Sequence, residues 1–319
     1  MISGIQKIIS RPSMNQQRFL MKEIKSAKNL DQIFNDKQYL ERCEFIMSQY
    51  DHKNGKLKVI DYSICEQQSW KSVFQSYRQI IQNHACEEIQ NAFYTLNQKL
   101  SFQEDQIPQL AKISEIFNEL NGWKIRPVPG LISDQDYLEA LSNKVYCSTQ
   151  IIRRPQDVEF SPYPDYIHDL LGHIIPIANR DISNKLNKIG CLSVNVDNEQ
   201  LEQIAFIYWK VFEMGFMKDK KGQYKALGGA VLSSHRELMN IYNQEVSIKH
   251  IRDFQMVKKN VQDESLQKEY YYIDSLDDID EVLENLQQSW SSNKNNSAIA
   301  DFHFQFDHSD QNKMQKLTL

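Results

Sequence analysis

The sequence predicts a mainly α protein with a small amount of β-structure (α+β). Glycine and proline are few, at ten and eight among 319 residues, so long helices can run uninterrupted. Apolar residues recur at three- and four-residue steps over most of the chain, whereas β-branched or alternating patterns are short. A chain of this length can bury a large core, as one catalytic domain or as two smaller ones.

Composition excludes several classes of protein. Hydrophobic residues at 41% and charged residues at 25% are ordinary for a soluble globular protein, and a formal net charge of −5 offers no general attraction to nucleic acid or anionic lipid. No apolar run approaches the roughly 18 residues of a membrane span, and the N-terminus lacks the apolar region of a signal peptide. Five cysteines without CxxC spacing predict reduced thiols. We therefore expect a cytoplasmic protein, with neither nucleic acid nor membrane as partner.

The chain divides into three parts. Residues 1–48 form a polar, partly helical N-terminal extension that is too short for a full regulatory domain, and the turn signal at 51–56 marks its boundary. A catalytic domain is expected over 49–290. Its predicted helices cover residues 64–83, 84–99, 108–121, 134–143, 199–216 and 277–290. Residues 291–319 are predicted to be a linker followed by a C-terminal β-hairpin.

Two segments, residues 122–132 and residues 145–153, are candidates for binding a small molecule. Residues 122–132 carry two prolines and a glycine within four residues, which excludes a regular helix and predicts a fixed loop. The loop is either a plain connection or a backbone wall for a flat heterocycle. Residues 145–152 are rich in β-branched side chains and predict a short strand. Arg153 follows it, and either lies on the surface or binds a substrate carboxylate bidentately.

The central motif is HDLLGH, which holds His168 and His173. Asp165 precedes it and is a suitable N-cap for the helix that carries His168. Five steps of about 100° place the two histidines roughly 140° apart on an ideal helix. The helix must therefore end or distort between them, and Gly172 is the residue best able to allow this. Alone, such a pair is weak evidence for a metal site, since capping or core roles fit it as well.

A second helix adds a carboxylate. Residues 199–216 are apolar nearly all round, so this helix is expected to be buried. Glu213 within it must be paired, protonated or metal-bound, because burying a bare charge is very costly. An arginine partner and a metal both remain open. Together with the two histidines, Glu213 would complete the ligand set of a non-haem iron oxygenase. Residues 228–234 follow as a small-residue segment that opens another helix and could line a substrate pocket.

Over about residues 50–319 the chain resembles the tetrahydrobiopterin-dependent aromatic amino acid hydroxylases, in particular the members that act on phenylalanine. The resemblance rests on RPVPGL at 126–131, HDLLGH at 168–173, IYW at 207–209 with EMG at 213–215, and LSS at 232–234. It implies a helical basket with a small sheet and a C-terminal β-hairpin, around one mononuclear iron.

The resemblance also implies roles for individual residues. The iron ligands would be His168, His173 and Glu213, with Asp169 as a further catalytic residue that faces the pterin through water. The implied cofactor-side positions are Gly130, Ile132, Tyr137, Asp169, Ala205 and Tyr208. The implied substrate-side positions are Arg153 for the carboxylate, Ser161 and Ser233 as hydroxyl support, Pro162 and Trp209 as walls of the ring, and Ala230. Tyr137 stands where the family usually has phenylalanine, so ring stacking is expected to survive.

The implied activity is that of a phenylalanine 4-monooxygenase, which uses Fe(II), tetrahydrobiopterin and O2 to convert L-phenylalanine to L-tyrosine. Ala230 adds a methyl group where the family usually has glycine and is expected to narrow the substrate pocket. The alternatives are a tyrosine or tryptophan hydroxylase of the same family and an inactive ligand-binding relative. The C-terminal hairpin resembles the family's association arm, but the long helix that completes a tetramer is missing. We therefore expect a monomer or homodimer, not a tetramer.

Overall fold

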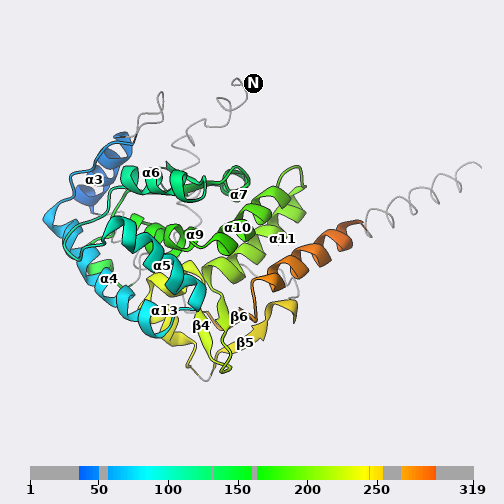
Figure 1. Ribbon diagram of the computed structural model, residues 1–319. Helices are drawn as coiled ribbons and strands as arrows, with labels where there is room; N and C mark the ends of the chain where they lie inside the picture. The colour runs from blue at the N-terminus through cyan, green and yellow to red at the C-terminus, as the bar shows by residue number, and fades with distance from the viewer. Residues whose placement is uncertain are drawn as a thin grey trace, which may run out of the picture.

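Helices make up most of the computed structural model, which describes residues 36–49, 57–128, 130, 132–159, 164–243, 245–253 and 267–291 and contains two small sheets (Figure 1). The prediction of a mainly α fold is confirmed. The predicted C-terminal hairpin and most of the predicted N-terminal extension lie outside these residues. The helices of the first half are α3 (Lys37–Ser48), α4 (Ile64–Asn83), α5 (Glu87–Leu100), α6 (Leu110–Leu120) and α7 (Asp134–Ser142).

Helix α4 shows why these predictions succeed. It covers the predicted range because Ser63 and Glu66 form a capping box at its start, and its aromatic stripe is buried in the core. Helix α5 begins three residues later than expected, since the backbone at Ala85 pairs with Ala226 instead. Helix α3, from the predicted extension, is held to the rest of the fold by an ion pair between Arg42 and Glu66 at 2.9 Å.

The first sheet corrects the loop predicted over residues 122–132. Strand β1 (Lys124–Pro127) pairs in parallel with β2 (Val145–Ser148), with Arg126 opposite Cys147. Both strands of a two-stranded sheet are edge strands, where proline is tolerated because its missing N–H can lie on the unpaired side. The second sheet has the order β4-β3-β6-β5. Its strands are β3 (Phe216–Lys218), β4 (Tyr224–Ala226), β5 (Ser247–His250) and β6 (Glu269–Ile273).

The second half is built from shorter helices. These are α8 (Tyr166–His168), α9 (Ile175–Ile177), α10 (Arg180–Leu192), α11 (Asn198–Tyr208), α12 (Gly229–Ser233) and α13 (His235–Asn240), the π-helical segments η3 (Asp169–Ile174) and η4 (Trp209–Glu213), the 3-10 turns η2 (Pro155–Asp157) and η5 (Ile251–Asp253), and a helix over 277–291. The prediction over 199–216 is wrong at its end, because α11 gives way to η4 and Phe216 begins a strand. The helix predicted over 277–290 is confirmed.

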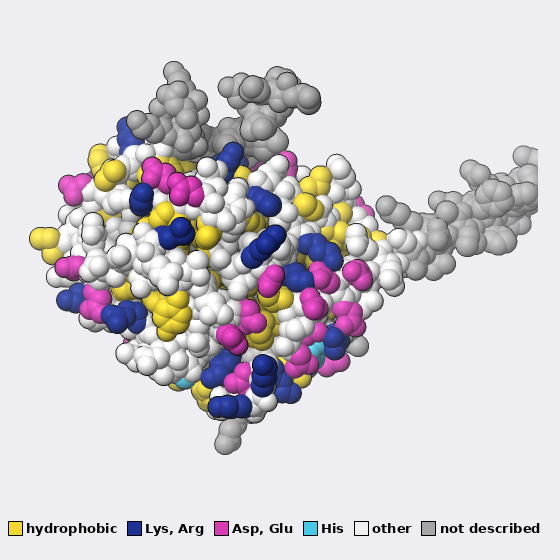
Figure 2. Space-filling model, viewed as in Figure 1, with side chains coloured by type: hydrophobic (Ala, Val, Ile, Leu, Met, Phe, Trp, Pro, Cys, Tyr) yellow, Lys and Arg dark blue, Asp and Glu magenta, His cyan; other side chains and the backbone are white. Residues whose placement is uncertain are grey.

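The surface agrees with the modest net charge. Figure 2 shows basic and acidic side chains interleaved on the face drawn, without a large field of one sign. Lys185 and Lys188 of α10, for example, both form ion pairs with Asp280. None of the helices in the described part of the chain is long and apolar enough to cross a membrane.

Candidate metal centre

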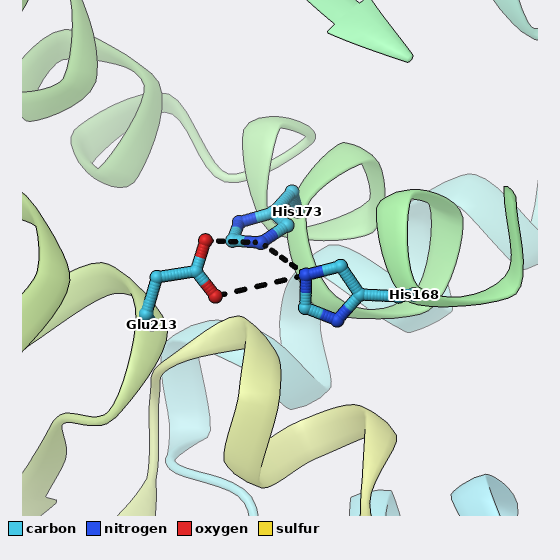
Figure 3. A group of neighbouring side chains, drawn as sticks. All are labelled: His168, His173 and Glu213. Atoms are coloured by element: carbon cyan, nitrogen blue, oxygen red, sulfur yellow. Dashed lines mark hydrogen bonds and ion pairs between the residues drawn. The ribbon is translucent and has the colours of Figure 1, made fainter. Parts of the chain in front are cut away.

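Two histidines and one glutamate from different segments point at one another (Figure 3). His168 ends α8, His173 lies in η3 and Glu213 ends η4. The two Nε2 atoms lie 3.1 Å apart, and the Glu213 oxygens lie 3.0 Å from His173 Nε2 and 3.6 Å from His168 Nε2. Three atoms that bind cations thus converge, and the structure brings together the three residues predicted as ligands.

The predicted distortion between the histidines is a π-helical segment. In η3 the Ile175 N–H donates to the carbonyl of Leu170, five residues back. This wider turn brings side chains five positions apart close together, and the imidazole centroids lie 4.8 Å from each other. The helix that carries Glu213 distorts in the same way, since the Met214 N–H donates to Trp209 O at 3.0 Å. Both ligand-bearing helices therefore widen at the site.

The role expected for Gly172 is corrected by its surroundings. Its backbone is not left-handed, and its importance is close packing: a Cβ there would lie 2.7 Å from the Cα and O atoms of Gly229. A Cβ on Gly229 would in turn lie 2.5 Å from His173 Nε2. Helix α12 therefore packs closely against η3, and the small-residue segment opens a helix as predicted.

The imidazole of His168 is oriented through its other nitrogen. Its Nδ1 lies 2.8 Å from Ser233 Oγ, and that hydroxyl donates to the carbonyl of Gly229 at 2.8 Å. Since the serine proton is used on Gly229, the serine oxygen accepts from Nδ1–H of His168. The lone pair of Nε2 is then directed at the centre, which is the tautomer that a metal ligand requires.

Burial and the neighbouring charges set the protonation of the triad. Burial lowers the pKa of His168 to about 4, against the opposing effect of Glu213. For His173 burial also lowers the pKa, but the charge and hydrogen bond of the closer Glu213 outweigh it and the net shift is upward. Burial raises the pKa of Glu213, yet the two histidines together bring it below its usual value. An ionised carboxylate beside a neutral His168 suits cation binding.

Asp169 is buried beside the triad and held by the end of β2. Its Oδ2 accepts from Thr149 N at 2.7 Å, Thr149 Oγ1 at 3.2 Å and Ser148 Oγ at 3.2 Å, while Oδ1 accepts from Tyr146 OH at 3.4 Å. Burial raises the pKa of Asp169 to about 7, although the Thr149 N–H opposes the shift. Sequence reasoning predicted this strand but did not single out its three polar side chains.

Arg153 is buried, 3% exposed, and not on the surface. Its Nε and Nη2 bind both oxygens of Asp165 at 3.0 and 2.8 Å, and its Nη1 donates to Val158 O at 3.2 Å. Asp165 also accepts from the N–H of His168 at 3.0 Å, so the predicted N-cap is confirmed. One N–H on each Nη atom has no partner among the described residues.

Of the remaining predicted positions, Tyr137 and Tyr208 are connected to His173 by hydrogen bonds. The hydroxyls of Tyr137 and Tyr208 lie 2.5 Å apart, and the Tyr208 hydroxyl lies 3.3 Å from His173 Nδ1. Gly130 is buried with φ +152°, a conformation that suits glycine. Half-buried positions are Ile132, Ala205, Trp209 and Ala230. Ser161 and Pro162 lie outside the described residues.

A second group of cation-binding side chains was not predicted. His250 at the end of β5 has Nε2 3.4 Å from Asp274 and 3.2 Å from Asp278. Asp278 also pairs with Arg252 at 2.6 Å and accepts from the backbone N–H groups of Asp274 and Ser275. This group therefore resembles the triad in composition while serving the start of the helix over 277–291.

Comparison with known proteins identifies similar chains. A sequence model described as "Biopterin-dependent aromatic amino acid hydroxylase" matches residues 14–303. Tyrosine 3-monooxygenase of Canis lupus familiaris is 32% identical over 254 residues, which cover 79% of this chain and 51% of that protein. The chain thus spans about half the length of the curated relatives it matches.

Solved structures share the fold. The phenylalanine hydroxylase of Colwellia psychrerythraea 34H superposes with a TM-score of 0.62 at 27% identity, over 72% of this chain and 88% of the other. The phenylalanine hydroxylase of Chromobacterium violaceum, solved with iron(III) and 7,8-dihydrobiopterin, gives a TM-score of 0.66 at 24% identity, over 78% and 92%. At that identity the second likeness concerns the fold alone.

Proposed function

Since this chain belongs to the biopterin-dependent aromatic amino acid hydroxylases, we propose that it is an Fe(II)- and tetrahydrobiopterin-dependent monooxygenase that converts L-phenylalanine to L-tyrosine with O2. The observation that carries the proposal is the convergence of two imidazoles and one carboxylate from π-helical or adjoining segments. Two histidines and a carboxylate on one side of a metal leave its other positions open to co-substrates.

The triad fits Fe(II) in the chemistry of its donors. His168 and His173 would supply neutral nitrogen and Glu213 a carboxylate oxygen, and Ser233 holds one imidazole in the required tautomer. Bound there beside a reduced pterin, iron supplies the activation of O2 that the protein itself cannot. The buried surroundings keep water away from that reaction.

The pterin would lie between the 130–137 segment and the end of α11. Tyr137 and Tyr208, whose ring centroids lie 5.3 Å apart, would offer aromatic surfaces to a flat heterocycle, and Gly130, Ile132 and Ala205 are the further positions proposed for that side. Asp169 presents a carboxyl group that Thr149 and Tyr146 hold in place. A heterocycle rich in N–H groups is a suitable partner for such an oxygen.

The amino acid would be held at its carboxylate. Arg153 is fixed by Asp165 on one edge, so the free end of its guanidinium can receive a carboxylate bidentately without a change of rotamer. Asp165 also caps the helix of His168, which ties the substrate arginine to the metal ligand. Trp209, directly after Tyr208, is the proposed wall for the aromatic ring, and Ala230 limits the pocket.

The similar proteins support two candidate substrates, phenylalanine and tyrosine, both of them aromatic amino acids. The Colwellia structure favours phenylalanine, whereas tyrosine 3-monooxygenases at 32% identity favour tyrosine as the second candidate. The test is turnover after anaerobic Fe(II) reconstitution, with a reduced pterin, O2 and each of Phe, Tyr and Trp, and with products identified by mass spectrometry. Tyrosine formed from Phe, with the other two slow, is expected. DOPA as the main product would make the second candidate correct, and no hydroxylated product would overturn both.

A further inference from the structure

The hydroxyl group of Tyr137 makes no hydrogen bond to His168, His173 or Glu213 in the described part of the chain. Its partner at 2.5 Å is the Tyr208 hydroxyl, which lies 3.3 Å from His173 Nδ1. All three side chains are largely buried, and the Tyr208 and His173 rings are stacked with centroids 6.3 Å apart. Buried hydroxyl groups have no bulk water to bond with, so each of their protons needs an acceptor within the protein.

The direction of these hydrogen bonds follows from the metal centre. For His173 to present the lone pair of Nε2 to a cation, its ring proton must be on Nδ1, so the Tyr208 oxygen must accept it. The Tyr208 proton then has to go elsewhere. The other hydrogen-bond partner of Tyr208 in the described part of the chain is Tyr137, whose oxygen therefore accepts that proton.

The opposite direction disables the ligand. If Tyr137 donated to Tyr208, the Tyr208 proton would be given to His173 Nδ1, and the imidazole proton would sit on Nε2 where the cation binds. Without a cation, Glu213 lies 3.0 Å from His173 Nε2 and can accept a proton from it, so the productive direction is the one that a bound cation selects.

We propose that Tyr137 is a positioning residue for the metal: its oxygen takes the Tyr208 proton and thereby keeps the His173 proton on Nδ1. Removing that oxygen leaves a buried Tyr208 O–H whose remaining partner among the described residues is His173 Nδ1, and this favours the tautomer that cannot bind a cation. The identity of the metal rests on the proposed function, but the hydrogen-bond argument does not require turnover.

The test is a double-mutant cycle on Co(II) affinity, measured by visible absorption with a competing chelator and without pterin, O2 or amino acid. The variants are Tyr137→Phe, Tyr208→Phe and the double variant. Tyr137→Phe is expected to weaken Co(II) binding about tenfold, as partners behind metal ligands do. In the Tyr208→Phe background it should cost nothing further, because the proton to be accommodated is gone.

Tyr62→Phe is the matched control. It also removes one buried hydroxyl, which donates to Gln150 O at 3.1 Å, and it should leave Co(II) affinity unchanged. A packing role for Tyr137 would give the same loss in both backgrounds and would overturn the proposal, as would wild-type affinity in Tyr137→Phe. If the cycle shows the expected coupling while no amino acid is hydroxylated, the proposed function fails and this inference stands.

Discussion

The two groups of histidine and carboxylate side chains have similar composition and opposite hydrogen bonding. Around His168, Nδ1 donates to Ser233 and Nε2 is directed at the other ligands. Around His250, Nδ1 instead accepts from the backbone N–H of Arg252 at 3.1 Å, so the ring proton is on Nε2, which lies 3.4 Å from Asp274 and 3.2 Å from Asp278 but donates no hydrogen bond among the described residues. Closeness alone therefore does not make a metal site; the partner of the far nitrogen decides whether a lone pair is available.

The carboxylates differ as well. Each oxygen of Asp278 already accepts from donors of the protein, namely Arg252 on one side and two backbone N–H groups on the other. Glu213 has the two ligand histidines as its partners in the described residues, and no arginine accompanies it. The oxygens of Glu213 therefore remain available to a cation, whereas the oxygens of Asp278 already bind other parts of the chain.

The largest expected effect is on metal binding by two matched substitutions. His173→Ala should lower Fe(II) or Co(II) affinity at least about a hundredfold and abolish turnover. Loss of a group that only supports a ligand already costs roughly 10- to 100-fold, and loss of a ligand should cost no less. His250→Ala should retain one metal per chain with unchanged affinity. Metal titration of both variants is the measurement. Loss of the metal from His250→Ala would break the distinction between the groups.

For the free energy of unfolding, the His250 group is expected to matter more than the triad. Asp278→Asn replaces one accepting oxygen with an NH2 group, which then faces either Arg252 or the backbone N–H groups, donor against donor. The free energy of unfolding should fall by about 3 kcal/mol. Glu213→Gln should change it by less than about 1 kcal/mol, because an amide can donate to a histidine nitrogen. Urea denaturation of the metal-free variants measures both. Equal losses would show that the triad also serves the fold.

A third pair tests the packing that positions the triad. Gly229→Ala would put a Cβ 2.5 Å from His173 Nε2, so the imidazole must move, and metal affinity should fall about thirtyfold, within the range for displaced supporting groups. Gly222→Ala is the control: it strains a surface turn with φ +78° by about 1 kcal/mol but should leave affinity unchanged. Unaltered binding in Gly229→Ala would mean that the site relaxes freely.

The sequence predicted what depends on local pattern. Helix α4 and the cap at Asp165 follow from residues within a few positions of each other, so their positions were predictable. Strand β1 was not, because its partner lies about twenty residues away and its own sequence is proline-rich. Likewise the ligands could be named from motifs, whereas the π-helical form of their helices could only be predicted as a distortion.

The surroundings of the triad were the hardest part to predict. Ser148 and Thr149 reach Asp169 only because β2 packs against η3, and Tyr146 joins them through the same contact. The His250 group depends on strand β5 meeting the start of a helix some 25 residues later. No local pattern predicts such contacts, so the sequence predicted the three residues that converge and missed much of what holds them in place.

The smallest expected effect addresses the far nitrogen itself. Ser233→Ala removes the acceptor of His168 Nδ1–H and frees the Gly229 carbonyl, without touching the cation-binding atoms. Metal affinity should fall about tenfold, the lower range for such partners. Ser183→Ala is matched to it, since Ser183 is equally buried and donates to Arg180 O at 2.9 Å, and it should leave affinity unchanged. Co(II) titration of the two variants decides the point. If both variants bind Co(II) as the wild type does, packing against α12 orients the imidazole, and the direction of the hydrogen bonds does not distinguish the two groups.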